Sequence, residues 1–275
     1  MNNLMVRTLS GIGFGIIMLA GLLVNKFIFA GLVVLVMCLM MVEFYRMTMG
    51  SSYKFSRVLA IFSAVVQFVL VFCHCAFGLE WKFLSIAMIP IMVVMVNSLY
   101  VKDKSEFGKF SYIYTALLYI AAPMALANCV AINDGEFRGV LMLCFFIIIW
   151  ASDVGAYALG ISLGQKYGKK LFPSVSPKKS WIGFWGGLAS AIISAVALNL
   201  FGLLEIPMLH CIILSILMNI AGVYGDLFES QWKRYYDVKD SGNIMPGHGG
   251  MLDRFDSALM AIPVGAVYLS LLNLI

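Results

Sequence analysis

The sequence predicts an all-α, polytopic membrane protein with about nine transmembrane helices, and three observations support this fold class. Hydrophobic residues make up 62% of the 275 residues, charged residues make up 12%, and the mean hydropathy is +0.94. Soluble domains carry roughly a quarter charged residues. The apolar residues also form long unbroken runs, whereas a transmembrane β-barrel needs alternating strands of about ten residues. Helices are expected because lipid offers no hydrogen-bond partner to an open backbone.

Nine apolar stretches each hold close to the roughly 20 residues that a helix needs to cross a bilayer. They lie at about 8–24, 28–48, 57–78, 83–100, 111–132, 138–163, 181–203, 206–229 and 255–275. No soluble domain, long linker or convincing internal repeat interrupts them.

The basic residues predict how these spans are oriented. With the N-terminus inside, 16 of the 19 Lys and Arg residues fall on the inner side, and the three on the outer side are Lys26, Lys82 and Arg138. Cytoplasmic loops of membrane proteins carry such an excess of cations. The inner set is Arg7, Arg46, Lys54, Arg57, Lys102, Lys104, Lys109, Lys166, Lys169, Lys170, Lys178, Lys179, Lys233, Arg234, Lys239 and Arg254. The net charge of +5 is therefore a topology signal, and no nucleic-acid partner is expected.

The cysteines lie mostly inside apolar runs, where they are interpreted as small hydrophobic residues. They are Cys38, Cys73, Cys75, Cys129, Cys144 and Cys211. His74, between two of them, is a faint metal signal, but no second Cys/His group lies nearby in the sequence.

Two polar features mark the sixth stretch and the loop that follows it. Asp153 lies well inside an apolar run, where a carboxylate costs about 2.5–3.5 kcal/mol on insertion scales. It is expected to face a polar cavity or a partner, and a structural hydrogen bond between helices is the alternative. The inner loop from Gly164 to Trp185 is basic and contains Ser-Pro-Lys-Lys-Ser-Trp at 176–181. Such loops bind anionic headgroups or only set topology.

The segment from Asp226 to Asp256 differs from the rest of the chain. It holds ten charged residues, six acidic and four basic, among clustered glycines. Asp226, Glu229, Ser230 and Lys233 are spaced i, i+3, i+4, i+7, which places them on one face of a helix.

Three aspartates of this segment are candidate metal ligands: Asp226, Asp253 and Asp256. If two helix ends meet, these carboxylates can converge on Mg²⁺, which favours oxygen ligands and bridges to substrate phosphates. Nearby cations would neutralise phosphate oxygens, and a glycine run would let backbone N–H groups approach them. The cations are Lys233, Arg234, Lys239 and Arg254, and the glycine run lies at 247–250. A loop at the membrane border whose charges only solvate it is the alternative.

The same residues resemble the signature of phosphatidate cytidylyltransferases (CDP-diacylglycerol synthases). That pattern reads S-x-x-K-R-x4-K-D, a short gap, then P-G-H-G-G-x-x-D-R-x-D, and every position is filled. The matching residues are Ser230, Lys233, Arg234, Lys239, Asp240, Pro246, Gly247, His248, Gly249, Gly250, Asp253, Arg254 and Asp256. A match of this length is specific. The 176–181 segment resembles the family's S-P-K-K-[ST]-W, and residues 43–45 resemble its E-F-Y pattern.

The resemblance implies a reaction of CTP with phosphatidate that gives CDP-diacylglycerol and pyrophosphate, in phospholipid synthesis and with Mg²⁺ as cofactor. The implied catalytic set is Ser230, Lys233, Arg234, Lys239, Asp240, His248 and Arg254. The implied substrate-binding set is Asp153, Lys178, Lys179, Ser180, Gly249 and Gly250, beside the metal ligands given above. Residues 1–135 would be N-terminal transmembrane helices, and residues 136–275 a C-terminal transmembrane catalytic region.

The expected partners are the two substrates and membrane lipids, and a homodimer stays open. The expected location is the inner, cytoplasmic membrane, with the N-terminus and the active site on the cytoplasmic side. One position departs from the family pattern, because Ile182 precedes Gly183 where an acidic residue is usual. Lys178 and Lys179 therefore either lack that carboxylate partner or use another.

Two other classes of protein are alternatives to this interpretation. A CDP-alcohol phosphotransferase carries a D-G-x-x-A-R run followed by two spaced aspartates, and this run is absent from the sequence. A transporter could use Asp153, Asp226 and Glu229 as an ion path. Transporters commonly show repeated halves with broken helices near mid-membrane, and no paired half is evident in this sequence.

Overall fold

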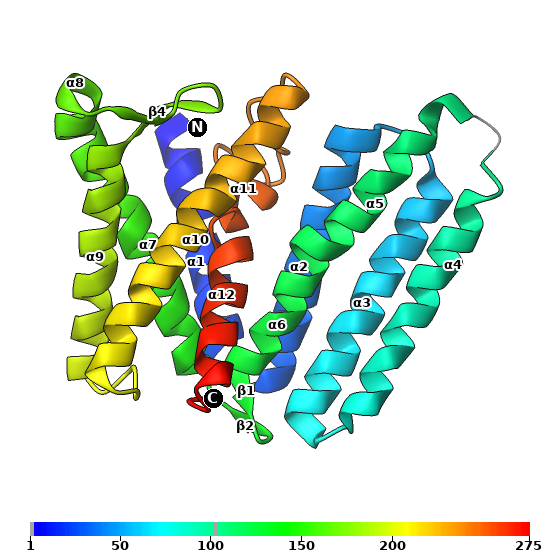
Figure 1. Cartoon of the computed structure of the whole chain (residues 1–275), viewed down its shortest axis with the longest axis horizontal. Helices are drawn as coiled ribbons and strands as arrows, with labels where there is room; N and C mark the ends of the chain where they lie inside the picture. Colours follow the sequence, from blue (N-terminus) through cyan, green and yellow to red (C-terminus); the bar gives the residue numbers. More distant parts are fainter. Residues whose placement is uncertain (1–2, 102–103) are drawn as a thin grey trace. The chain divides into compact units, whose positions relative to one another are not determined.

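The computed structural model describes residues 3–101 and 104–275, which are helical almost throughout (Figure 1). Lys102, one of the cations assigned to the inner side, lies outside the described residues. The chain forms two compact units: Met1–Gly139 with Asp240–Asp253, and Val140–Lys239 with Arg254–Ile275. The predicted functional division at residue 135 stays a prediction.

The first unit consists of helices and one short hairpin. Its elements are α1 (Asn3–Leu23), α2 (Lys26–Met49), α3 (Lys54–Phe77), the 3-10 helix η1 (Trp81–Ala87), α4 (Met88–Ser98), the 3-10 helix η2 (Lys104–Lys109), α5 (Phe110–Ala116), the π-helical turn η3 (Leu117–Ala121), α6 (Ala122–Ala131), β1 (Ile132–Asn133) and β2 (Glu136–Phe137). The two strands pair antiparallel. Helix α3 packs against α2, α4 and α6, and Figure 1 shows these helices side by side.

Local sequence explains where the central helices of this unit begin and end. Asn25 caps α2, since its side chain accepts hydrogen bonds of 2.9 Å from the backbone N–H groups of Phe27 and Ile28. Helix α3 ends at Phe77 and is capped by Gly78, whose φ of 68° is readily available to glycine and whose N–H donates to the carbonyl oxygen of His74.

The second unit is built around one long helix. Its elements are α7 (Gly139–Leu159), the π-helical turn η4 (Gly160–Gly164), α8 (Gln165–Tyr167), β3 (Lys170–Phe172), β4 (Ser176–Ser180), α9 (Trp181–Leu200), α10 (Met208–Tyr235), α11 (Leu252–Phe255) and α12 (Ala258–Leu271). Strands β3 and β4 pair antiparallel. Helix α10 packs against both α9 and α12, as Figure 1 shows.

Seven helical segments among the described residues are long and apolar enough to cross a membrane. All nine predicted stretches are largely helical, but the count of nine spans is not confirmed. Helix α1 contributes a shorter apolar stretch, Arg7–Leu23. Helix α12 has 14 residues and contains Pro263, so it is shorter than the roughly 20 residues that a bilayer needs.

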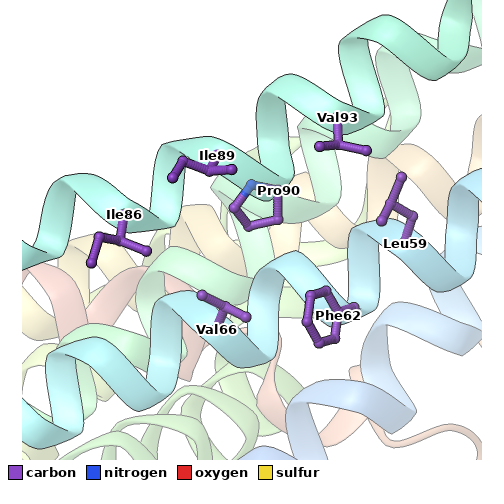
Figure 2. Close-up of a pocket in the computed structure, with 7 residues that line it drawn as sticks. All are labelled: Leu59, Phe62, Val66, Ile86, Ile89, Pro90 and Val93. Atoms are coloured by element: carbon purple, nitrogen blue, oxygen red, sulfur yellow. The ribbon is translucent and has the colours of Figure 1, made fainter.

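Large apolar side chains remain exposed on the spans of the first unit, as expected for surfaces that face lipid tails. Figure 2 shows an open apolar groove whose lining comes from α3 on one side and from η1 and α4 on the other. Its lining residues are Leu59, Phe62, Val66, Ile86, Ile89, Pro90 and Val93. All-α architecture and exposed apolar helices together identify an integral membrane protein.

Candidate active site

Helix α10 carries the first half of the signature segment. The predicted helical face is confirmed, because side chains four residues apart contact each other along it. The Ser230 hydroxyl donates a hydrogen bond of 3.2 Å to Oδ1 of Asp226, and Nζ of Lys233 lies 2.6 Å from Oε2 of Glu229. Glu229 is fully buried, so the positive charge of Lys233 compensates a carboxylate that water does not solvate.

A second cation reaches α10 from the basic loop. Lys179 on β4 places its Nζ 2.5 Å from Oδ2 of Asp226. The acidic residue that usually precedes Gly183 in the family is absent, and Lys179 instead uses a carboxylate from a distant helix. The ion pair is partly buried, which strengthens it relative to a surface pair.

Further carboxylates of the second unit gather around Asp226. Asp256 follows α11 in a turn, outside the seven candidate spans, and burial raises its pKa to about 7, with the negative charge of Asp226 adding to the rise. The charge of Asp153 on α7 acts on Asp256 in the same direction. Asp153 also feels the charges of Lys179 and Arg254. The structure therefore brings together five predicted site residues from four segments of the second unit.

Small residues allow these segments to approach. Gly225, next to Asp226, faces the backbone of Asp256 so closely that a Cβ there would clash with the Asp256 carbonyl oxygen. Gly187 on α9 faces Ser152 and Asn219, and the Ser152 hydroxyl donates a 2.7 Å hydrogen bond to the Asn219 side chain. This buried link joins α7 to α10 one residue before Asp153, so it positions that carboxylate.

Residues 240–253 of the signature form a loop in the first unit, here called the signature loop, and Asp253 organises its backbone. Oδ2 of Asp253 accepts hydrogen bonds from the Ser241 N–H (2.9 Å), the Ser241 hydroxyl (3.0 Å) and the Gly250 N–H (2.7 Å). Gly249 adopts a φ of 88°, and a Cβ there would lie 2.9 Å from Oδ2 of Asp253 and near Asp240. Gly249 and Asp253 together therefore determine the shape of the loop.

Glu43 on α2, which is not among the predicted site residues, also contacts the signature loop. Its side chain is 1% exposed, and its Oε2 accepts hydrogen bonds from the Leu252 N–H (2.9 Å) and the Ser241 hydroxyl (3.3 Å). A Cβ on Gly250 would lie 2.6 Å from that oxygen, and one on Gly242 would clash with the other carboxylate oxygen. The loop therefore wraps around the Glu43 carboxylate, and only the weak E-F-Y resemblance pointed to this residue.

The N-terminal helix contributes a second anchor for the loop. The Ser10 hydroxyl on α1 lies 3.0 Å from Nδ1 of His248 and 2.9 Å from the carbonyl oxygen of Pro246. Gly247, between these two, has a φ of 79° and packs against Arg7. This contact fixes the orientation of the His248 ring, and no local pattern in the sequence indicated it.

The remaining predicted residues have different environments. Arg234, Lys239 and Arg254 are exposed and form no ion pair among the described residues, so their charges remain available. Lys178 is exposed on β4, whereas Ser180 is buried and caps α9 by accepting a 3.2 Å hydrogen bond from the Gly183 N–H.

The structure brings two of the three predicted metal ligands together. Asp226 and Asp256 lie in the second unit, whereas Asp253 belongs to the first unit with its loop. No group of three or more His, Cys, Asp or Glu side chains is arranged to hold a metal in the part of the chain that the structure describes. Asp253 lies on α11, which ends at Phe255, and Asp256 lies in the turn that follows.

Fold and charges together define an integral membrane protein in which carboxylates on α7 and α10 and in the turn after α11 gather with a lysine of β4, and in which a glycine-rich loop surrounds a buried glutamate. Residues 5–272 match the model of the cytidylyltransferase family. The chain therefore belongs to that family, as the signature predicted.

Several similar proteins carry the name phosphatidate cytidylyltransferase. One from Staphylococcus epidermidis is 31% identical over 261 residues, which is 94% of this chain and 96% of the relative. One from Bacillus subtilis is 38% identical over 181 residues, 66% of this chain and 65% of the relative. One from Rickettsia bellii is 32% identical over 185 residues, 65% of this chain and 77% of the relative.

Proposed function

We propose that this chain is a phosphatidate cytidylyltransferase, which converts CTP and phosphatidate to CDP-diacylglycerol and pyrophosphate. The observation that carries the proposal is the ion pair of Lys179 and Asp226. It joins the two segments that resemble the family, and it does so beside Asp153 and Asp256. Family membership over nearly the whole chain supports the same reaction.

The chemistry suits residues of these types. The attacking group, a phosphate of phosphatidate, is already an anion, so no side chain has to create the nucleophile. The difficulty is to bring two polyanions together, and positioned cations solve it by neutralising charge. Arg234, Lys239 and Arg254 are exposed cations that can hold phosphate oxygens. Gly250, by contrast, is buried, and its N–H already donates to Asp253.

The carboxylates also fit a divalent cation. Asp153, Asp226 and Asp256 repel one another electrostatically, and burial already favours the protonated form of Asp256. Oxygen ligands of this kind suit Mg²⁺, which would supply charge neutralisation for the reacting phosphates. Asp226 and Asp256 are the proposed ligands, and Asp253 remains the third predicted ligand.

Asp256→Asn tests the metal proposal. The amide loses one negative charge at nearly constant volume, so Mg²⁺ should no longer raise the melting temperature of the detergent-purified protein as it does for wild type. Turnover should fall by at least about 100-fold, since metal stabilisation of phosphate charge is worth several kcal/mol. Wild-type Mg²⁺ dependence in the variant, both in melting and in turnover, would contradict the assignment.

The orientation proposal places the signature loop and the N-terminus in the cytoplasm, where CTP is available. It rests on the excess of cations in the segments assigned to that side. Acyl chains of the substrate would stay in the bilayer while its headgroup reaches the helix ends.

Pyrophosphate release separates this function from the alternatives. Purified protein in detergent should release pyrophosphate from CTP only when phosphatidate is present, and CDP-diacylglycerol should form in equal amount. A CDP-alcohol phosphotransferase would consume CDP-diacylglycerol and release CMP, and a transporter would do neither. Either of those results would refute the proposal.

A further inference from the structure

Two cysteines of the first unit face each other across neighbouring helices. Cys75 lies near the end of α3 and Cys129 near the end of α6, and their sulfur atoms are 3.7 Å apart. Both side chains are partly exposed, and both are free thiols in the structure. A disulfide has an S–S distance of about 2.05 Å, so the sulfurs need to approach by about 1.7 Å.

The neighbouring groups do not make this pair a metal site. Cys73 is two residues from Cys75 on the same helix, about 200° around the helix axis, so the two project from different faces. The His74 ring nitrogen Nδ1 lies 2.6 Å from the carbonyl oxygen of Leu79. No three-ligand metal group occurs among the described residues.

The pair lies beside the β1–β2 hairpin. The carbonyl oxygen of Cys75 accepts a 3.1 Å hydrogen bond from the Gly135 N–H at the hairpin turn. Lys26, the first residue of α2, donates through Nζ to the Gly135 carbonyl at 2.9 Å and to the Ala76 carbonyl at 3.4 Å. Cys75, the hairpin and the start of α2 therefore occupy one end of the first unit.

The signature loop of this unit occupies the opposite end. It binds Glu43, which lies 17 residues after Lys26 on the same helix, or about 26 Å along the helix axis at 1.5 Å per residue. If α2 crosses the bilayer, the cysteine pair lies on the face opposite the loop. With the loop in the cytoplasm, the pair lies on the outer side, where disulfides form and persist.

We propose that Cys75 and Cys129 are an oxidation site that forms an intramolecular disulfide joining α3 to α6. A small disulfide compound is the oxidant. One cysteine thiolate attacks it and releases the first thiol; the second cysteine attacks the resulting mixed disulfide and releases the second thiol. Two cysteine thiols are thereby oxidised, one external disulfide is reduced to two thiols, and the two protons end on the released thiols.

Oxidised glutathione is the probe, applied to spheroplasts and to inverted membrane vesicles that contain the full chain. After alkylation of the remaining thiols, mass spectrometry of the digested protein should find peptides of Cys75 and Cys129 linked and lighter by two hydrogens. Because this probe does not cross membranes, the link should form in spheroplasts and not in inverted vesicles. Formation only in inverted vesicles would overturn the outer location.

Three variants sharpen the experiment. Cys73→Ser should still form the link, whereas Cys75→Ser and Cys129→Ser should each leave the remaining partner as a stable mixed disulfide with glutathione. Persistent mixed disulfides in wild type, or a link from either cysteine to Cys73, would overturn the pairing. The experiment detects the disulfide in peptides and does not measure turnover. A negative result would therefore refute the disulfide without bearing on the proposed function.

Discussion

The carboxylate of Glu43 shows how a residue outside the signature can control it. It lies 198 residues before Ser241 and 209 before Leu252, yet it accepts hydrogen bonds from both. Buried polar groups that lose their partners cost about 1–3 kcal/mol each. The shape of the signature loop therefore depends in part on a buried side chain of α2, beside Asp253 and Ser10.

Glu43→Ala should destabilise the protein and impair the signature loop. It leaves the Leu252 N–H and the Ser241 hydroxyl without this acceptor in a buried place, so we expect a loss of about 1–3 kcal/mol of stability and a higher KM for CTP. The matched control is Glu80→Ala, because Glu80 is an exposed glutamate paired with Lys82 and such pairs are worth about 0–1 kcal/mol. Thermal unfolding in detergent and steady-state kinetics measure both effects, and equal behaviour of the two variants would contradict this role.

Lys179→Met should reduce catalytic efficiency by at least about 10-fold, which corresponds to about 1.4 kcal/mol. The variant removes the cation that neutralises Asp226, so substrate phosphates would meet an uncompensated carboxylate. Lys170→Met is the control, because Lys170 is exposed on β3 and is not part of the proposed site. Initial rates at varied CTP and phosphatidate measure kcat/KM. A Lys179 variant within twofold of the Lys170 variant would remove Lys179 from the site.

At the scale of elements, the approach of α10 to the turn before α12 places Asp226 beside Asp256. Gly225 allows this approach because it has no side chain, and its backbone lies against the Asp256 carbonyl oxygen. One turn earlier, Gly222 faces Ser257 with more space, and a Cβ there would lie 3.5 Å from the Ser257 Cβ. Two glycines on the same helix face thus differ in how much room they leave.

Gly225→Ala and Gly222→Ala form a matched pair that tests this packing. Alanine favours a helix over glycine by about 0.8–1 kcal/mol, so Gly222→Ala should be neutral or slightly stabilising. Gly225→Ala should lose about 1–3 kcal/mol through overpacking and shift Asp256, which lowers turnover. Melting temperature and pyrophosphate release measure the pair. Similar melting and turnover in both variants would show that the backbones do not approach so closely.

Hydropathy and spacing predicted the helices and one face of the site well, because both are local properties of the chain. The stretch 206–229 is helical as expected, and α10 continues to Tyr235 with Ser230 against Asp226 and Lys233 against Glu229. Contacts between distant segments could not be predicted in this way. No periodicity connects Ser10 to His248 or Lys179 to Asp226, since each pair joins a helix to a distant loop or strand and forms only in the folded chain.

The role of Asp253 illustrates the same limit for chemistry. Its residue type and its spacing from Asp256 favoured a metal ligand, yet one of its oxygens accepts three hydrogen bonds from the loop itself. Sequence spacing can single out a carboxylate as a candidate ligand, but it does not show which hydrogen-bond donors surround that carboxylate in the folded chain. The signature aspartate therefore shapes the loop, whatever else it binds.

At the scale of the whole molecule, orientation in the membrane decides whether the site can meet CTP. The candidate span Gly139–Tyr167 separates the β1–β2 hairpin from the β3–β4 hairpin in the chain. If this segment crosses the bilayer once, the two hairpins face opposite compartments. Lys169, Lys170, Lys178 and Lys179 all follow the span, so the positive-inside rule assigns the β3–β4 hairpin to the cytoplasm.

Single cysteines in a variant that lacks the six native ones test this orientation. Ser174 lies in the turn between β3 and β4, Glu136 lies on β2, and both are exposed. A membrane-impermeant maleimide should label Glu136→Cys in spheroplasts and Ser174→Cys only in inverted vesicles, because the span separates them. Labelling of both from the same side would mean that the segment does not cross. The reverse pattern would place Lys179 outside the cell, where CTP is absent, and would be incompatible with the proposed reaction.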